Sequence, residues 1–154
     1  AFWLGFCCVS IVLIIALRRQ ICLPEMAEAV QFLFLVIASP MSVCLTGYVK
    51  AYGAGISYPM LLGLFGIATI FYITALIQVP KFLKRSFYPS YASFTFPFVI
   101  SAIGVRDILS YFTSQHIVFR ALEILASLES VIAILLVLYT LLRYIRHVRQ
   151  AVRF

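Results

Sequence analysis

The sequence predicts an all-α, polytopic membrane protein with one membrane domain, residues 1–154, and five transmembrane helices. Its composition is 64% hydrophobic and 11% charged with a mean hydropathy of +1.10, whereas soluble domains are roughly half apolar and a quarter charged. A helix needs about 20 apolar residues to cross a bilayer, so the chain holds about five spans. The basic residues lie at the ends of apolar runs. The net charge of +7 therefore indicates membrane orientation, and we expect no nucleic-acid partner.

The first three expected helices cover residues 2–17, 29–49 and 60–79. The first is an uninterrupted apolar run that stops at Arg18. The second follows a break that contains Pro24 and ends before Lys50. The third follows the Gly-rich segment AYGAGISYP and is closed by Pro80. Each run is long enough to cross as a helix, which satisfies its own backbone groups where water is absent.

The last two expected helices cover residues 86–105 and a run that begins near Ile117. The fourth run carries no charge and is followed by Arg106 and Asp107. This pair is expected either to cap the helix end as an ion pair or to raise the local anion concentration at a pore mouth. The fifth run ends in the basic segment RYIRHVRQAVR, which we interpret as a membrane anchor at the inner leaflet of the lipid bilayer.

The basic residues predict the orientation, because positive charge is retained in cytoplasmic loops. Nine of the 12 Lys and Arg residues lie on one side of the five-span topology, and three, Lys50, Arg106 and Arg120, lie on the other. We therefore expect a multi-pass protein of the cell (plasma) membrane with a cytoplasmic C-terminus and an N-terminus on the opposite face. We also expect the chain to be part of a longer protein. The nine residues are Arg18, Arg19, Lys81, Lys84, Arg85, Arg143, Arg146, Arg149 and Arg153.

Two of the five runs contain an internal proline, Pro40 in the second and Pro97 in the fourth, each among Ser and Thr residues. A proline inside a spanning helix removes one hydrogen bond and bends the helix. Such a kink is tolerated where neighbouring helices or a water-filled cavity satisfy the freed groups. The alternation of smooth and kinked runs suggests outer and inner helices of a bundle. The alternative is that both prolines reflect only the higher frequency of proline in spanning helices.

If the kinked runs are inner helices, their side chains could line a pore. In the fourth run Ser93, Phe96 and Ile100 fall on one face at spacings of three and four, with Pro89 and Ile103 extending it. A phenyl ring on this face could block a path by its size and by dewetting, or Phe96 could be one more packed aromatic residue. The hydroxyl groups that could meet a partly dehydrated anion belong to Ser42, Thr46, Ser93, Thr95 and Ser101.

Two carboxylates lie within the fifth run, where an ionised group is costly. Glu123 is three residues from Arg120, and we expect this pair to form an ion pair at helical spacing. Glu129 has no basic residue within four positions. It is expected either to accept a hydrogen bond from another helix or to be a protonatable group that couples transport to protons.

The chain carries no recognisable metal, cofactor or enzyme motif. Cys7, Cys8, Cys22 and Cys44 have no CxxC spacing, and the two His residues have no partners at metal-ligand spacing. No Ser/His/Asp set or paired acid and base is present. We therefore expect no cofactor, no metal and no enzymatic activity.

Two segments carry a resemblance to a known family. SYASFTFP at 90–97, continued by VISA, closely resembles the penultimate-helix motif of the tellurite-resistance/dicarboxylate transporter family. LP at 23–24, ASPMS at 38–42 and GY at 47–48 are similar to its seventh helix, although Met41 stands where small residues are usual. The family includes bacterial tellurite-resistance proteins, fungal malate and sulfite permeases and plant slow anion channels. On this alignment the chain matches helices six to ten, the C-terminal half of a ten-helix protein.

The resemblance implies a fold and a function. It implies ten helices arranged as five hairpins around a central pore, commonly in a homo-oligomer of three subunits, with residues 29–49 and 86–105 as inner helices. In the family a phenylalanine before the ninth-helix proline occludes the pore, and the matching residue is Phe96.

The function predicted on these grounds is transport of small anions, such as malate or another C4-dicarboxylate, or tellurite or another inorganic anion. The alternative within transport is sulfite efflux or another small-anion channel. From a different class, the chain could be a membrane-embedded interaction subunit without transport activity, in which the prolines shape a protein interface.

Overall fold

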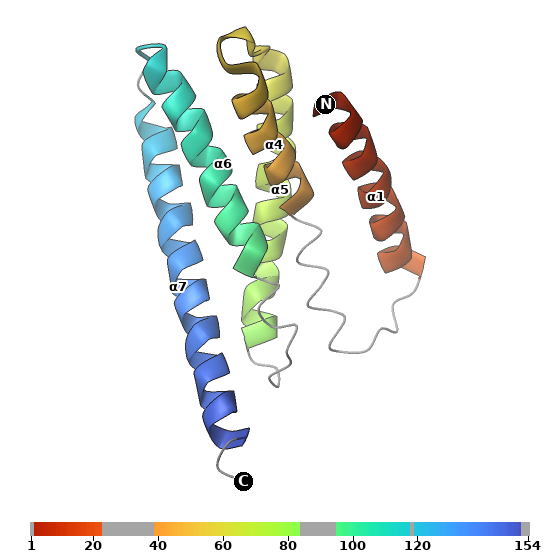
Figure 1. Cartoon of the computed structure of the whole chain (residues 1–154), viewed down its shortest axis with the longest axis vertical. Helices are drawn as coiled ribbons and strands as arrows, with labels where there is room; N and C mark the ends of the chain where they lie inside the picture. The colour runs from red at the N-terminus through yellow and green to blue at the C-terminus, as the bar shows by residue number, and fades with distance from the viewer. Residues whose placement is uncertain (1, 23–38, 84–94, 118, 152–154) are drawn as a thin grey trace.

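The computed structural model describes residues 2–22, 39–83, 95–117 and 119–151, and these are all helices and short turns (Figure 1). The elements in chain order are α1 (Phe2–Cys22), α4 (Ser39–Tyr52), the 3-10 turn η1 (Gly53–Gly55), α5 (Tyr58–Leu83), α6 (Thr95–Ser114) and α7 (Arg120–Ala151). The predicted all-α class is therefore confirmed for the described residues.

Four of the five helices are long and apolar enough to cross a membrane. They are α1, α5, α6 and α7, with candidate spans of 18, 24, 20 and 31 residues. The fifth, α4, has 14 residues, and most of the first half of the expected run 29–49 lies outside the described residues. The chain thus has the helices of a multi-pass membrane protein.

The helices alternate in direction, so that α1, α5 and α7 run one way and α4 and α6 run the other (Figure 1). Helix α6 packs between α4 and α7, and α5 packs against α4 (Figure 1). Helix α1 lies beside α4, and its Phe2 ring contacts Tyr48 and Tyr52 of that helix. The N-terminus and the C-terminus lie at opposite ends of the bundle, as the basic-residue pattern predicts.

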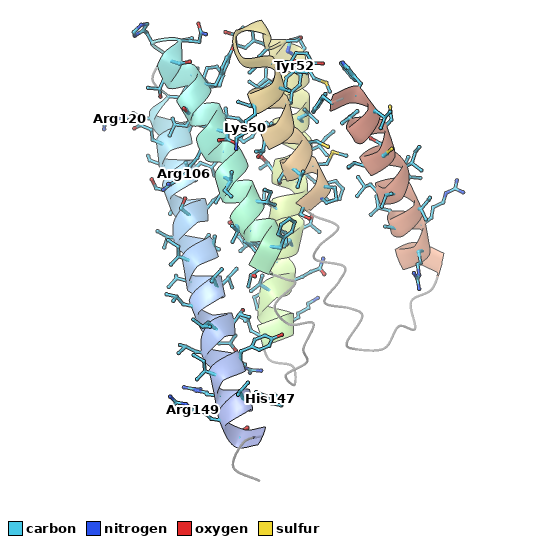
Figure 2. All side chains as sticks on the ribbon, viewed as in Figure 1. Lys50, Tyr52, Arg106, Arg120, His147 and Arg149 are labelled. Carbon is cyan, nitrogen blue, oxygen red and sulfur yellow. The ribbon has the colours of Figure 1, made fainter. Side chains whose placement is uncertain are left out.

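The two ends of the bundle differ in composition. One end, here the aromatic end, gathers ring contacts from α1, α4, α5, α6 and the turn before α7, including Phe2–Tyr48 at 5.3 Å, Tyr58–Phe112 at 6.4 Å and Phe112–Phe119 at 5.1 Å between ring centroids. Tyrosine and tryptophan side chains are enriched where a protein crosses the membrane–water interface. The other end, here the basic end, carries Arg18, Arg19, Lys81, Arg143, Arg146 and Arg149; Figure 2 shows His147 and Arg149 there, far from Lys50 and Tyr52.

Side chains of α7 satisfy the last turn of α5 at the basic end. The terminal carbonyl groups of a helix have no partner within the helix. The Leu83 carbonyl accepts hydrogen bonds from Tyr139 Oη at 3.4 Å and Arg143 Nη2 at 3.3 Å. A guanidinium group at a helix C-terminus also interacts favourably with the helix dipole. We had predicted that this helix closes at Pro80. Helix α5 instead continues to Leu83, and the contact with α7 stabilises its additional residues. Pro80 lies inside α5, and its missing N–H removes one hydrogen bond from that helix.

At the aromatic end, short turns join α4 to α5 and α6 to α7, and hydrogen bonds hold each turn. The Ser57 backbone N–H donates to the Tyr48 hydroxyl at 2.9 Å, which ties the start of α5 to α4. Helix α6 ends in a Schellman motif, in which the Ile117 N–H donates to the Phe112 carbonyl and the His116 N–H to the Thr113 carbonyl, both at 3.0 Å. His116 occupies the left-handed position of this motif, with φ of 59°.

Two clusters of buried side chains form the core. One lies between α5, α6 and α7, and its largest fully buried ring is Phe98, which meets Tyr72 edge-on at 5.4 Å between centroids. The other lies around α4 and includes Leu45 and Leu61, each 1% exposed. Helix α4 is thus buried in the bundle, whereas the long helices leave much apolar side-chain surface exposed, as expected where lipid is the solvent.

Candidate functional site

The candidate site is helix α6 with the surfaces of α4, α5 and α7 that surround it. Its sequence alternates small residues with larger apolar ones, which lets neighbouring helices approach closely. Each predicted site residue that the structure describes lies on α6 or on α4. The two helices carry these residues on different faces, and the faces have different chemistry.

One face of α6 holds a buried polar pair. Ser101 Oγ donates to Glu129 Oε2 at 2.9 Å, and the two residues are 5% and 3% exposed. The hydroxyl of Tyr72 on α5 lies near this carboxylate and has no hydrogen-bond partner among the described residues. Of the two expectations for Glu129, the geometry agrees with a carboxylate that accepts a hydrogen bond from another helix. A role for Glu129 in proton coupling is not tested by this contact.

A second face of α6 meets α4 at Gly104. A Cβ atom at this position would lie 3.3 Å from Thr46 Oγ1 and 3.6 Å from the Ser42 carbonyl oxygen. A side chain larger than that of glycine therefore requires at least the Thr46 side chain to move. Gly104 is the one glycine in the apolar run from 95 to 105, and a small residue inside such a run is the signal that could have located this contact, because small residues let helices approach closely.

An ion pair joins the same two helices nearer the aromatic end. Lys50 Nζ of α4 lies 3.3 Å from Asp107 Oδ2 of α6, and the Asp107 side chain is 22% exposed. We had expected Asp107 and Arg106 to close the helix, either as a capping pair or as a pore mouth. Both residues instead lie inside α6, which continues to Ser114. The carboxylate of Asp107, within the helix, thus has a basic partner on α4.

A third face of α6 is uncovered by the described helices. Phe96 is 48% exposed, Ile103 is 39% exposed, and Ile100 between them is half-buried. This is the stripe that the spacing of three and four predicted. Phe98, two residues along, points into the core and is fully buried. Phe98 and Phe96 therefore lie on different faces of the same helix turn, where Phe98 is packed in the core and Phe96 is exposed.

The predicted pore-lining residues do not share this uncovered face. Ser42 and Ser101 are buried at 1% and 5% exposure, within the packing between helices. Thr46 is half-buried with its hydroxyl oxygen against Gly104, and Thr95, at the start of α6, is half-buried. Ser93 lies outside the described residues. Whether any of these hydroxyl groups meets an ion stays a prediction.

Both predicted kink prolines occupy the first turn of a described helix. Pro40 is the second residue of α4 and Pro97 is the third residue of α6. The N–H groups of a first turn have no partner within the helix, so proline is well tolerated there. The segments before Ser39 and Thr95, where the expected helices would continue, lie outside the described residues.

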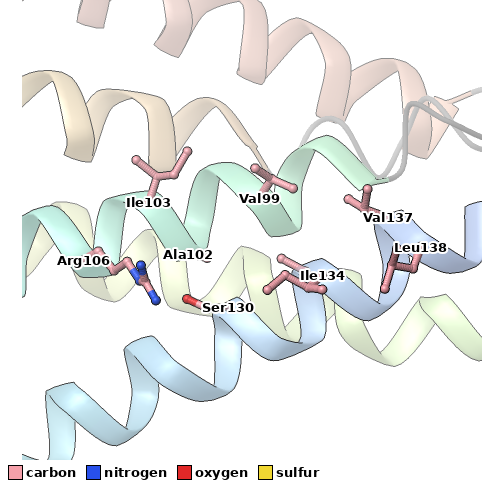
Figure 3. Close-up of a pocket in the computed structure, with 9 residues that line it drawn as sticks. Val99, Ala102, Ile103, Arg106, Ser130, Ile134, Val137 and Leu138 are labelled. Carbon is pink, nitrogen blue, oxygen red and sulfur yellow. The ribbon is translucent and has the colours of Figure 1, made fainter. Parts of the chain in front are cut away.

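Two adjoining cavities follow the seam between α6 and α7. One is apolar, about 330 Å³, and is lined chiefly by Val99, Ile103, Ala133, Ile134 and Val137 (Figure 3). The other is about 820 Å³, lies towards the aromatic end, and is lined by hydroxyl-bearing residues with Glu123. Arg106 lines both, and Figure 3 shows its side chain extending from α6 towards Ser130 of α7.

The acidic, basic and sulfur-bearing side chains give no other site. Among the described residues, no three His, Cys, Asp or Glu side chains lie close enough to hold a metal ion. Cys7 and Cys8 are exposed and Cys44 is buried, all as free thiols. The prediction of an Arg120–Glu123 ion pair is wrong. The structure describes both residues, and the ion pair found among the described residues joins Lys50 and Asp107 instead. Arg120 and Glu123 are exposed, and water screening removes most of the gain from pairing them.

Comparisons with protein-family models, with curated proteins and with solved structures found no match to this chain. The resemblance to the tellurite-resistance/dicarboxylate transporter family therefore stays a prediction that rests on the motifs quoted above.

Proposed function

We propose that this chain forms one side of a pathway for small anions through a membrane, with Phe96 as the gate. The observation that carries the proposal is the uncovered face of α6, where Phe96, Ile100 and Ile103 form a continuous apolar stripe. A stripe of this kind restricts a pathway by diameter and by dewetting, and it does not bind the ion strongly.

Three further features support this reading. The net charge of the chain is +7, which favours anions over cations near the membrane surfaces. Arg106 lies two helical positions beyond Gly104, exposed and close to the same stripe. The motif that contains Phe96 resembles that of a family of small-anion transporters. On that resemblance the substrate would be a C4-dicarboxylate such as malate, or tellurite, with sulfite as the alternative, and the assembly would be a homotrimer in the cell membrane.

Anion flux into liposomes that contain the full-length protein tests the proposal. Replacing Phe96 by Ala removes the ring and should raise the flux of chloride, sulfite or malate at least several-fold. The matched control is Phe119→Ala, because Phe119 is 47% exposed against 48% for Phe96 but lies in the turn before α7, away from the stripe. The control should leave the flux unchanged.

The proposal is contradicted if neither the wild type nor Phe96→Ala conducts any of these anions. Phe96→Ala should also keep the thermal stability of the wild type in detergent, since the exposed ring makes little contribution to the core. A variant that lost both flux and stability would show that Phe96 acts as a packing residue.

A second candidate is a membrane-embedded interaction subunit that transports nothing. The observation that favours it is the burial of Ser42 and Ser101, which leaves the uncovered stripe almost without hydroxyl groups. A stripe of bare apolar side chains is also what a partner helix would cover. Under this reading Phe96→Ala weakens co-purification of a partner and changes no flux.

A further inference from the structure

The seam between α6 and α7 is amphipathic along its length. Its inner half is the apolar cavity of about 330 Å³, and its half towards the aromatic end is the polar cavity of about 820 Å³. Arg106 lines both cavities and therefore marks the boundary between them. A cavity that is apolar towards the membrane interior and polar towards the membrane surface fits an amphipathic molecule with its apolar part inside and its polar part outside.

The apolar half has the dimensions of a chain-binding groove. On α6 it runs from Arg106 back to Val99, and on α7 from Ser130 to Leu138, which is about 10 to 12 Å of helix at 1.5 Å per residue. Ala102 and Ala133 form part of its floor, where their small side chains leave room. Such a groove can hold part of one acyl chain and exclude the bilayer from the seam.

The polar half contains two opposite charges without partners. Arg106 at its inner end and Glu123 at its outer end are both exposed, and neither forms an ion pair with another described residue. Glu123 precedes Ser130 by about two helical turns, or about 10 Å along α7. The order is thus apolar groove, positive charge, negative charge, from the membrane interior outward.

We propose that the α6–α7 seam binds a single phospholipid with an ethanolamine head group. In such a lipid the acyl chain, the phosphate and the primary ammonium group follow one another in the same order. The acyl chain lies in the apolar groove, Arg106 donates to the phosphate, and the ammonium group donates to Glu123. Charge-assisted hydrogen bonds of this kind are the strong ones.

The charges select this lipid against its neighbours in a bilayer. The quaternary ammonium of a choline head group has no N–H to donate to Glu123. A glycerol head group brings a net negative charge next to the same carboxylate. A primary ammonium group satisfies Glu123 and the phosphate satisfies Arg106, so no charge in the polar cavity stays unpaired. This site and the anion pathway proposed above share Arg106 and Ile103, whereas Glu123 belongs to the lipid site alone and Phe96 to the pathway alone.

Native mass spectrometry of the delipidated full-length protein in detergent tests the proposal. Palmitoyl-oleoyl lipids with ethanolamine, choline and glycerol head groups are added separately, and bound copies are counted. The ethanolamine lipid should bind one copy per chain about tenfold more tightly than the choline lipid, as expected for one charge-assisted hydrogen bond.

Substitutions assign the contacts. Glu123→Gln should remove the preference for ethanolamine over choline, and Arg106→Gln should weaken all three lipids about tenfold. Arg120→Gln is the matched control, since Arg120 starts α7 at the same end but lines neither cavity. Ile134→Trp should fill the apolar groove and reduce binding of every lipid, whereas Leu135→Trp, at a neighbouring exposed position outside the groove, should not.

Equal affinity of the wild type for the three head groups overturns the proposal, as does an Arg106→Gln variant that binds like the wild type. A disulfide between Ile134→Cys residues of two copies, formed in native membranes, also overturns it, because a second protein chain would then occupy the seam. Glu123→Gln and Ile134→Trp change α7 and leave the Phe96 stripe intact, so in these two variants the flux assay reports on the anion pathway separately.

Discussion

Ser101 of α6 and Glu129 of α7 form a hydrogen bond, and both side chains are nearly inaccessible to solvent. A carboxylate inside a membrane-spanning helix is costly unless a donor satisfies it. Ser101 supplies one donor, and the Tyr72 hydroxyl is close by. The pair therefore fixes the rotation of α7 relative to α6 about one point.

Replacing Ser101 by Ala should lower the free energy of unfolding by about 1–3 kcal/mol, because Glu129 then stays buried without its donor. Glu129→Gln should cost less, since the amide oxygen still accepts the bond and carries no charge. Denaturation of the purified protein in detergent, followed by circular dichroism, measures both. Ser110→Ala is the control, because Ser110 is exposed. Equal stability of Ser101→Ala and Ser110→Ala would show that the bond contributes nothing.

At the scale of elements, α4 and α6 can pack closely because Gly104 has no side chain at their contact. The close approach at Gly104 leaves no space for a Cβ atom without movement of Thr46. The Lys50–Asp107 ion pair then closes the same interface nearer the aromatic end. Since α4 has 14 residues, its position depends strongly on these few contacts.

Gly104→Leu should destabilise the protein by about 1–3 kcal/mol or more, as overpacking does, and should separate α4 from α6. Gly66→Leu is the matched control on α5, because a Cβ atom there meets nothing within 4 Å. The melting temperature in detergent measures both. Gly66→Leu should be neutral or stabilising, because leucine favours a helix more than glycine does. An equal loss in both variants would show that the close contact at Gly104 is not the cause.

The existence of the helices could be predicted because long apolar runs are local signals. The helix ends could not, because distant contacts set them. The extension of α5 to Leu83 depends on Arg143, and that of α6 past Arg106 accompanies a pair between Asp107 and Lys50. In the candidate site, the spacing of Phe96, Ile100 and Ile103 predicted that they share one face, but it left open whether Phe96 is a packed ring or an exposed one. The burial of Ser42 and Ser101 could not, since spacing does not say which neighbour covers a face.

For the whole molecule, the separation of an aromatic end from a basic end predicts one orientation in the membrane. Positive charge favours the cytoplasmic side, so the basic end with Arg146 and Arg149 should face the cytoplasm. The α6–α7 turn at the aromatic end should then face outward.

Single cysteines in a background without native cysteines test this orientation. Gln115→Cys at the aromatic end should react with a membrane-impermeant maleimide in intact cells. Gln150→Cys at the basic end should react only after the cells are permeabilised. The opposite labelling pattern would invert the topology and would place the polar half of the α6–α7 seam on the cytoplasmic side.

The shared acceptor at Leu83 links the motions of α5 and α7. Tyr139 and Arg143 both donate to this one oxygen, and a shift of α7 by one helical turn, about 5.4 Å, would carry both donors out of reach together. Small rotations that keep the oxygen within reach lose neither bond. A tilt of α7 that pivots near Leu83 would therefore keep both hydrogen bonds, whereas sliding of α7 along its axis would break them.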